Sequence, residues 1–243
     1  MDFAQIDALK AKLESLGSLK ANVLTRLRMQ FMAENIYNSN AMEGGSLAPE
    51  DITRILGKGY RSTKAPTQEQ LEVLGHKEAF DYIATQAEVG GALTEEIIKE
   101  VHARLLAHDE ARRGKYRDVD IMVRGAVIQP PKPYLVPMQM EAMMAVYNAR
   151  RYSRHIIEAV AQLHLDLEEL CPFADGNTAT GRMLVNLELM RAGYLPVDIK
   201  FNDRRRYYAS FENYIMTGSI AMLAELIAEY EEFELRARIS LLG

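Results

Sequence analysis

Apolar residues recur at helical spacing along most of the chain, which predicts a protein built mainly of α-helices. The first stripe contains Phe3, Ile6 and Leu9 and ends near Gly17. Comparable stripes begin near Leu24, Leu71, Ile97, Pro137, Ile156, Met183, Asp203 and Ile220. The pattern therefore favours an all-α fold.

The most regular stripe lies between residues 156 and 170. Val160, Leu163, Leu167 and Leu170 fall on one face of a helix with 3.6 residues per turn. A long apolar face of this kind is typical of a helix that is buried against its neighbours. We therefore expect this segment to be a central helix.

Residues 119–128 break the helical pattern. Ile121 and Val123 alternate with polar residues or Met122, and an Arg-Gly pair that follows offers a turn. The alternation predicts a short β-hairpin. Because an isolated hairpin is only marginally stable, it must lie on something or bind something. Residues 56–69 are predicted to form a long loop.

Composition restricts the classes of function. The 243 residues are 48% hydrophobic and 26% charged with a net charge of -5, which indicates an ordinary globular protein without the broad basic field that nucleic acid needs. The single cysteine excludes an intrachain disulfide framework and a cysteine-rich zinc site. No apolar run is long enough to span a membrane, and the N-terminal stretch has no signal-peptide core, so a cytoplasmic location is expected.

The segment CPFADGNTATGR, residues 171–182, places glycine and polar residues directly before a helical stripe. Gly176 and Asn177 permit unusual backbone dihedrals, and Thr178 or Thr180 is expected to cap the helix that follows. The first N–H groups of a helix have no internal partner, and the helix dipole is positive there. The segment therefore predicts an anion site.

Two charged residues strengthen this interpretation. Arg182 lies within the first turns of the helix and can supply a fork of donors to phosphate oxygens. Asp175, just before the glycine, could hold a divalent cation beside a diphosphate. The alternative is an ordinary turn with a helix cap, because short motifs also match by chance.

The segment resembles the signature of the Fic (Fido) family, H-P-F-x-D-G-N-G-R-x-x-R. The matching positions are Pro172, Phe173, Asp175, Gly176, Asn177 and Arg182. The run from Ser39 to Gly44 is similar to the family's inhibitory pattern. The predicted hairpin, between GKYR and Pro130-Pro131, is similar to the family's flap. Asp203-Arg204 and Tyr207-Tyr208 resemble the helix that follows in the family. The resemblance implies an all-α core with a short β-hairpin flap.

The family's usual reaction transfers AMP from ATP to a protein hydroxyl, and some members move other phosphate-containing groups. The resemblance implies ATP, or another nucleotide or diphosphate, together with Mg²⁺ held by Asp175. Arg182 would grip the terminal phosphate. Glu43, in the motif that begins at Ser39, would form a salt bridge with Arg182 and block productive placement of that phosphate.

The remaining roles also follow from the resemblance. Hairpin residues Ile121, Met122 and Val123 would align the target by strand pairing. The nucleotide would contact Gly176, Asn177, Thr178, Ala179, Thr180, Gly181, Arg182 and Tyr207.

The signature departs from the family at two places. Cys171 stands where the family has the histidine that takes the proton of the target hydroxyl. Thr178-Ala179 stands where the family has Gly-Arg, so a phosphate-contacting cation is missing. An unperturbed cysteine, with a pKa of about 8.5, is mostly protonated at neutral pH. AMP transfer should therefore be severely slowed, if it occurs.

Three interpretations of Cys171 remain open. It could be an inert small hydrophobe, or a thiolate nucleophile whose pKa is lowered by the helix N-terminus and a cation. It could also serve redox sensing or metal contact. Because His164, Glu168 and Cys171 share one helical face, Glu168 could pair with His164 or act as a substitute base. Glu168 could equally lie in water, and His164 could be a core residue.

The sequence thus predicts N-terminal helices with the inhibitory motif over residues 1–50 and a Fic-like domain over residues 51–243, in one structural unit. The leading hypothesis is a Fic-like transferase with degraded or altered catalysis. The alternatives are a non-catalytic nucleotide-binding regulator and a small-molecule enzyme that uses Cys171 and Glu168. The expected substrate is a hydroxyl of a protein or small molecule, without nucleic-acid or membrane partners, and homodimerisation is left open.

Overall fold

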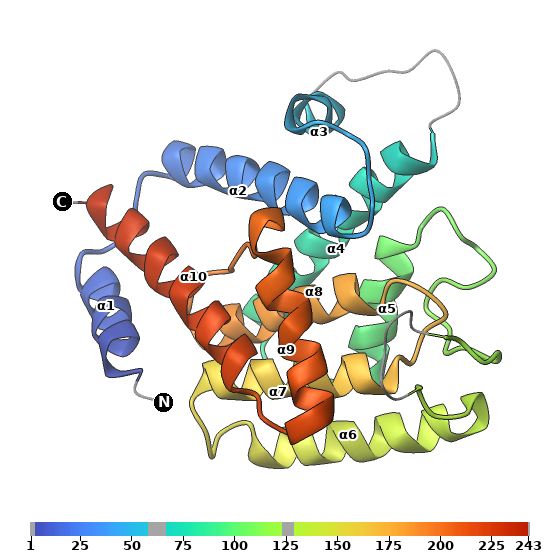
Figure 1. The fold of residues 1–243 in the computed structure, drawn as a ribbon. Coiled ribbons are helices and arrows are strands. Elements are labelled where there is room, and N and C mark those ends of the chain that lie inside the picture. Colours follow the sequence, from blue (N-terminus) through green and yellow to red (C-terminus); the bar gives the residue numbers. More distant parts are fainter. Residues whose placement is uncertain (1–2, 58–66, 123–128, 243) are drawn as a thin grey trace.

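The computed structural model describes residues 3–57, 67–122 and 129–242. These residues form ten α-helices and two 3-10 helices (Figure 1). The α-helices are α1 (Ala4–Ser15), α2 (Ala21–Met42), α3 (Pro49–Leu56), α4 (Gln68–Val89), α5 (Glu95–Leu105), α6 (Val136–Arg150), α7 (Ile156–Leu170), α8 (Asn177–Arg191), α9 (Arg204–Thr217) and α10 (Ala221–Ser240). The 3-10 helices are η1 (Pro133–Leu135) and η2 (Phe201–Asp203).

The predicted helical fold is confirmed, with one addition. Helix α3 was not predicted: Ile52, Ile55 and Leu56 follow the helical period, but the pattern lasts only about two turns. The predicted hairpin is not confirmed. Residues 119–122 contain no strand, and residues 123–128, including Val123, lie outside the described residues. Most of the predicted loop over residues 56–69 also lies outside them.

Helices α7 and α8 occupy the centre of the fold (Figure 1). Leu163 and Leu184 belong to an apolar cluster shared with α2, α4, α5 and α6. Leu165 and Leu189, from other faces of the same two helices, belong to a second cluster shared with α1, α9 and α10. Both central helices are therefore apolar on more than one side, as expected for buried helices.

Glycine allows α7 and α8 to approach closely. A Cβ atom placed on Gly181 of α8 would lie 2.0 Å from Nδ1 of His164 on α7. The imidazole ring of His164 therefore packs directly on the α8 backbone, and its side chain is fully buried. This contact fixes the position of α8 relative to the end of α7.

A polar network fastens α2 to the segment that precedes α9. The buried carboxylate of Asp198 accepts hydrogen bonds from Nδ2 of Asn35 (3.2 Å) and Nδ2 of Asn38 (2.8 Å), and it forms an ion pair with Lys200 at 2.7 Å. Oδ1 of Asn38 accepts the N–H of Phe201 at 3.0 Å. Because buried polar groups are costly unless paired, this network fixes the C-terminal half of α2.

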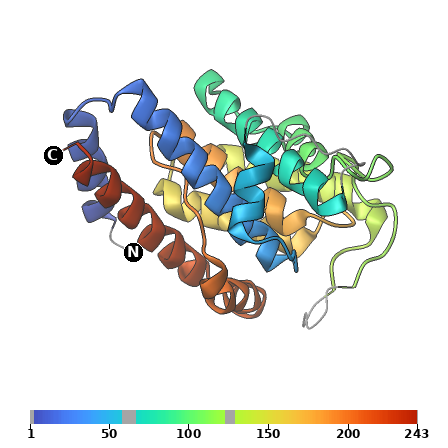
Figure 2. The same ribbon diagram turned by 90° about the horizontal axis from the view of Figure 1, so that it is seen from above.

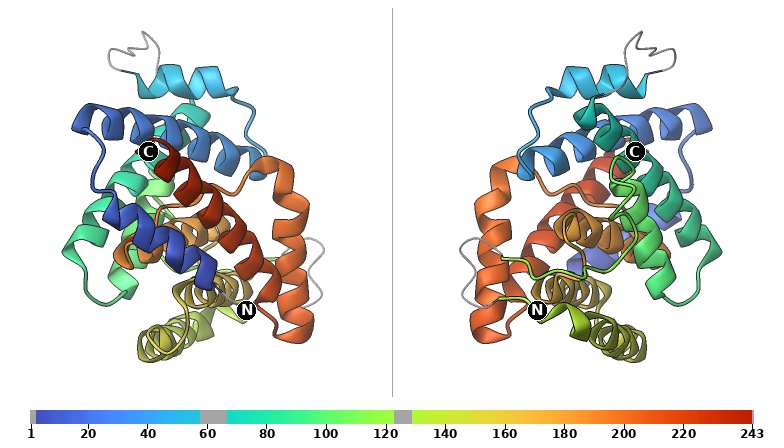
Figure 3. Two further views of the ribbon diagram at one scale, coloured as in Figure 1. Left: turned by 90° about the vertical axis from the view of Figure 1, so that its left-hand side faces the viewer. Right: turned by 90° about the vertical axis from the view of Figure 1, so that its right-hand side faces the viewer.

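The peripheral helices enclose this core. Figure 2 shows α1 and α10 on one side of the molecule and α5 on the opposite side. Helix α3 lies outside α2 in both views of Figure 3. None of the described helices combines the length and apolar character that a membrane crossing needs.

The replacement Gly181→Ala should destabilise the protein by about 3 kcal/mol or more, because the new methyl group would overlap the His164 ring. The matched control is Gly17→Ala, where φ is +79° but nothing lies within 4 Å of the added carbon. The control should cost only about 1 kcal/mol of backbone strain. Urea unfolding measures both values, and equal costs would contradict the close packing of α7 on α8.

Candidate active site

The loop between α7 and α8, residues 171–176, is held by a side chain from the first turn of α8. Oδ1 of Asn177 accepts the N–H of Phe173, and its Nδ2 donates to the Phe173 carbonyl oxygen, both at 2.9 Å. The amide therefore closes the loop with one donor and one acceptor. The contact of the Asn177 side chain with phosphate stays a prediction.

The cap of α8 also differs from the prediction. Gly176 occupies the N-cap position with φ 70°, a left-handed conformation that glycine adopts without strain, and no side chain caps the helix. Oγ1 of Thr180 donates to the Gly176 carbonyl oxygen at 2.7 Å instead of accepting an N–H group. Neither Thr178 nor Thr180 is the cap, so the first amides of α8 have no side-chain cap.

His102 of α5 supports the same loop. Its ring stacks on Phe173 at 3.7 Å, and its Nδ1 accepts the N–H of Gly114 at 2.9 Å. Nε2 consequently carries the proton and donates to the Asp175 carbonyl oxygen at 3.1 Å. Burial lowers the pKa of His102 to about 4, so the ring is neutral. Sequence reasoning did not identify this role.

Arg117 is a second loop support that sequence reasoning missed, although it is the arginine of the GKYR segment. Its buried guanidinium donates to the carbonyl oxygens of Cys171 at 2.7 Å, Val119 at 3.2 Å and Pro131 at 2.5 Å. The Arg117 N–H donates to the Pro172 carbonyl oxygen at 2.9 Å. One residue thus joins the loop to both ends of the segment predicted as a flap.

Arg182 is buried at 8% exposure within α8 and faces the C-terminal end of α2. Its Nη2 donates to Oγ of Ser39 and to Oε1 of Glu43, both at 2.6 Å. Its Nη1 makes a long contact of 3.4 Å with the hydroxyl of Tyr207. The Glu43–Arg182 salt bridge implied by the resemblance is therefore present, with the Glu43 side chain 42% exposed.

A cavity of about 220 Å³ lies beside this salt bridge, and we refer to it as the α8 cavity. Of the residues proposed for the site, Glu43, Asp175, Gly176 and Ala179 line it. Further lining residues, which sequence reasoning missed, are Asn40, Gln68, Glu72, His76 and His108. The cavity thus joins the inhibitory segment, the loop and the start of α8 in one place.

Three proposed nucleotide contacts face the interior instead. Tyr207 is fully buried beneath Arg182, and Thr180 is fully buried by its bond to the loop. Gly181 faces His164. Of these, Tyr207 supports the guanidinium rather than lining the cavity. On α8, the helical period of 3.6 residues explains why Thr180 and Gly181 face the interior while Ala179 lines the cavity.

A buried polar chain runs from Arg182 to Glu168. Because Arg182 donates to the Tyr207 oxygen, the hydroxyl proton is available to Nε2 of His164, at 2.5 Å. Burial and the charge of Arg182 lower the pKa of His164 to about 3, so the neutral ring carries its proton on Nδ1. Nδ1 lies 4.0 Å from Oε1 of Glu168, and neither atom has a hydrogen-bond partner in the described chain.

Glu168 is turned toward the start of α8 rather than into water. Its side chain is 13% exposed and lies close enough to the side chain of Thr178 for that hydroxyl to affect its pKa. Burial raises the pKa of Glu168 to about 7, against the opposing effects of Thr178 and Arg182. A carboxyl group that can gain or lose a proton near neutral pH therefore lies next to the first turn of α8, although it does not line the α8 cavity.

Cys171 ends α7 in a left-handed conformation, with φ 42°. Its thiol is 5% exposed and donates to the Glu168 carbonyl oxygen at 2.8 Å. Burial, followed by the negative charge of Glu168, raises the pKa of Cys171 to about 12. This direction is opposite to the one that the thiolate hypothesis requires, because a thiolate nucleophile needs a lowered pKa.

Comparisons with known proteins agree with this arrangement. Residues 92–189 match the Fic/DOC family. The protein adenylyltransferase Fic of Nematostella vectensis is 32% identical over 241 residues, which are 96% of this chain and 55% of that protein. The protein of the same name from Culex quinquefasciatus is 30% identical over 95% of this chain and 46% of its own length. The chain spans about half the length of the curated relatives it matches.

Solved structures share the fold. A Fic domain containing signaling protein from Bacteroides thetaiotaomicron has a TM-score of 0.89 and 25% identity, over 98% of this chain and 97% of that one. Fic-1 from C. elegans has a TM-score of 0.83 and 25% identity, over 98% of this chain and 70% of that one. The helical fold and the loop with its arginine define a Fic-type domain. A Fic/DOC family match covers residues 92–189, and the resemblance stated from the sequence is confirmed.

Cys171 should react slowly with iodoacetamide at pH 7.5, at least about a hundredfold more slowly than an exposed cysteine, because the thiol is buried and its pKa is raised. The matched control is the double variant Cys171→Ser, Ser153→Cys, whose single cysteine lies at an exposed position. Mass spectrometry follows alkylation of both proteins. Equal rates would show that Cys171 is an accessible thiolate.

Glu168→Gln should change the pH dependence of stability. With a folded-state pKa of about 7, above its usual 4.5, Glu168 keeps its proton in the folded protein at pH values where the unfolded chain has released it. Its contribution to the free energy of unfolding is therefore present at low pH and is lost as the pH rises through about 7. Between pH 4.5 and pH 8, the free energy of unfolding of the variant should rise relative to that of the unchanged protein by at most about 3 kcal/mol.

Urea unfolding at several pH values measures this gain. Glu169→Gln, at the exposed neighbouring position, is the control and should follow the unchanged protein. Parallel stability curves for Glu168→Gln and the unchanged protein would mean that Glu168 is ionised in water.

Proposed function

We propose that this chain is a Fic-type transferase that binds ATP with Mg²⁺ at the start of α8 and transfers AMP to a protein hydroxyl. Transfer is restrained by Glu43 and slowed by Cys171. The observation that carries the proposal is the buried Arg182, whose guanidinium reaches the Glu43 carboxylate beside the α8 cavity. The names of the relatives, protein adenylyltransferase Fic, support the same reaction.

The phosphates of the nucleotide bind at the N-terminal end of α8. The amides at Asn177 and Thr178 stand at the positive end of the helix, and Arg182 adds a cation one turn further on. The cavity of 220 Å³ is smaller than the roughly 300–1,000 Å³ of typical ligand sites. Displacement of the Glu43 carboxylate both enlarges the space and frees Arg182, which accounts for the inhibitory role of Ser39 and Glu43.

Asp175 fits a magnesium ion in this site. It is exposed at the cavity, and its Oδ1 accepts the Gly176 N–H at 2.8 Å, which fixes the carboxylate beside the helix start. Proteins commonly hold Mg²⁺ with one or two carboxylates together with substrate phosphates and water. The bound ion would neutralise phosphate charge, and no other described residue is required as its ligand.

The proton of the target hydroxyl must be removed when its oxygen attacks the α-phosphorus and pyrophosphate leaves. Cys171 is a poor base for this step because its proton is retained up to a pKa of about 12. Glu168, with a pKa of about 7, is the substitute base in this proposal, and Nδ1 of His164 lies 4.0 Å from its Oε1. Because Glu168 is largely buried outside the cavity, transfer is slow.

The target segment docks on the chain after Arg117. Met122 is 88% exposed, and Ile121 beside it is partly exposed, so both are accessible to a partner strand. Arg117 holds Val119 and Pro131, and it thereby fixes both ends of this segment next to the loop. The described ends of the proposed flap are therefore tied to the loop between α7 and α8.

A non-catalytic nucleotide-binding regulator is the second candidate. It is favoured by the buried, protonated Cys171 and by Ala179, which lines the cavity without supplying a cation. In that case the site binds ATP without turnover. The two candidates differ in whether an unrestrained chain with its own Cys171 transfers AMP at all.

Radiolabelled ATP tests the transfer. Glu43→Gly alone should label a protein acceptor slowly, and Glu43→Gly with Cys171→His should label it about 100-fold faster or more, because general acid–base catalysis contributes about that factor. Adding Ala179→Arg, which places a guanidinium in the cavity, should raise the rate further.

The controls separate the candidates. Glu43→Gly with Arg182→Lys should abolish labelling in every background, because the proposed phosphate contact loses its fork of donors. Labelling by the double variant Glu43→Gly, Cys171→His, with none by Glu43→Gly alone, would favour the non-catalytic regulator. No labelling by any variant would overturn the transferase proposal.

A further inference from the structure

A second cavity, of about 300 Å³, lies on the side of α8 opposite to the loop, at the turn between α6 and α7. We call it the arginine pocket. Residues that define it are Gly91, Arg151, Arg154, Ile156, Glu188 and Arg191. Three guanidinium groups and one carboxylate give the lining a charge excess of two positive charges.

Both oxygens of the single carboxylate in this lining already accept hydrogen bonds. Oε1 of Glu188 accepts a hydrogen bond from Nη1 of Arg191 at 2.5 Å. Its Oε2 accepts hydrogen bonds from the hydroxyl of Tyr147 at 2.7 Å and from Nη1 of Arg151 at 3.3 Å. Glu188 therefore orients two arginines, and both of its oxygens are occupied.

Arg191 retains an unused donor. Its side chain is 7% exposed, and its Nε donates to the Gln86 carbonyl oxygen at 3.4 Å. Its Nη2 is buried without a hydrogen-bond partner in the described part of the chain. A buried charged donor without a partner is costly, so an acceptor supplied by a ligand would remove a penalty already present in the protein.

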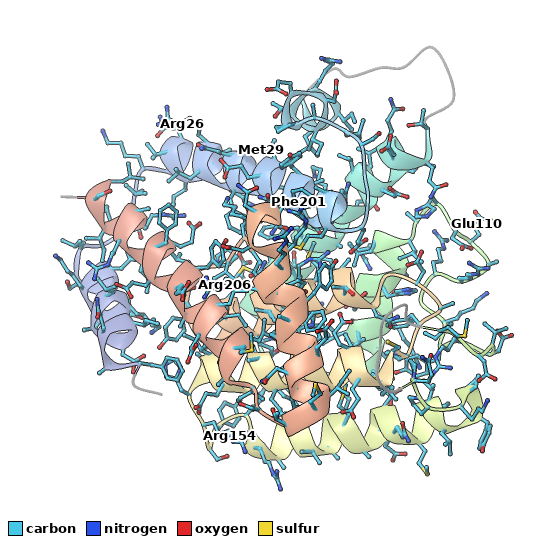
Figure 4. All side chains as sticks on the ribbon, viewed as in Figure 1. Arg26, Met29, Glu110, Arg154, Phe201 and Arg206 are labelled. Atoms are coloured by element: carbon cyan, nitrogen blue, oxygen red, sulfur yellow. The ribbon has the colours of Figure 1, made fainter. Side chains whose placement is uncertain are left out.

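One further feature favours an anion in this place. Arg154 reaches the surface at the α6–α7 turn (Figure 4), and it forms no ion pair among residues 3–57, 67–122 and 129–242. The nearby Asp166 is engaged by Tyr214 at 2.5 Å and by Gln162 at 2.7 Å.

We propose that the arginine pocket binds the dianionic phosphate group of a small molecule, between Arg154, Arg151 and the free Nη2 of Arg191. Gly90 and Gly91, with φ of 74° and 93°, line the pocket, and a Cβ atom added to either would meet no atom within 4 Å. Arginine is suited to this role because its planar fork matches phosphate oxygens. The site is separate from the α8 cavity and does not depend on the proposed transferase activity.

Titration of ¹⁵N-labelled protein tests the proposal. Inorganic phosphate and glycerol phosphate are added at constant ionic strength up to about 10 mM, a range that detects millimolar dissociation constants. The amides of Gly90, Gly91 and Ile157 should shift and saturate. The amides of Gly176 and Thr178 report binding at the α8 cavity independently.

Three variants define the result. Arg154→Ala should weaken binding about tenfold, and Arg191→Lys, which keeps the charge but removes the second donor, should also weaken it. Arg206→Ala, at an exposed arginine paired with Glu229 (Figure 4), should leave binding unchanged. If glycerol phosphate binds more tightly than inorganic phosphate, the natural ligand is a phosphate ester. If inorganic phosphate binds more tightly, the natural ligand is the free phosphate ion.

The proposal is overturned if Gly90 and Gly91 show no saturable shift. It is also overturned if Arg154→Ala binds as Arg206→Ala does, since the shifts would then reflect general ion screening. Unchanged affinity in Arg191→Lys would contradict the role assigned to its buried donor. Shifts confined to the α8 amides would mean that phosphate binds only in the α8 cavity.

Discussion

The burial of one positive charge organises the site. Arg182 is 8% exposed inside the central helix, and a charge in that position is costly unless it is paired. The protein supplies Ser39 from α2, Glu43 directly after that helix and the Tyr207 hydroxyl from α9. A nucleotide phosphate could satisfy the same guanidinium, so the internal carboxylate and the proposed ligand compete for one cation.

Contacts between helices fix the positions of the groups around Arg182. Asp198 holds α2 through Asn35 and Asn38, and Gly181 allows α7 and α8 to touch. His102 and Arg117 then hold the loop between those two helices. The functional groups are therefore placed by packing and hydrogen bonds between elements that are distant in sequence.

Much of this arrangement could be predicted from the sequence. The apolar period located nine of the ten described α-helices, and α3 was missed because it is short. The loop and its partner motif allowed Glu43 to be placed against Arg182. Side-chain direction was less predictable: Tyr207 and Gly181 face the interior, and Asn177 closes the loop. Those outcomes depend on tertiary packing, which spacing along one helix does not contain.

Residues that act through backbone carbonyl groups were also beyond sequence reasoning. Arg117 and His102 bind main-chain atoms, which carry no residue-type signal. The same limit applied to Cys171, whose thiol donates to the carbonyl of the preceding helical turn. Its raised pKa follows from burial, whereas the helix N-terminus visible in the sequence argued for a lowered pKa.

The competition at Arg182 is tested most directly by the dissociation constant of magnesium-bound ATP in a double-mutant cycle. Calorimetry would compare the unchanged protein, Glu43→Gln, Arg182→Lys and the double variant. The account predicts that Glu43→Gln tightens ATP binding about tenfold, roughly 1.4 kcal/mol, and that this gain largely disappears when Arg182 is replaced by lysine. Equal tightening with arginine or lysine at position 182, or none at all, would contradict it.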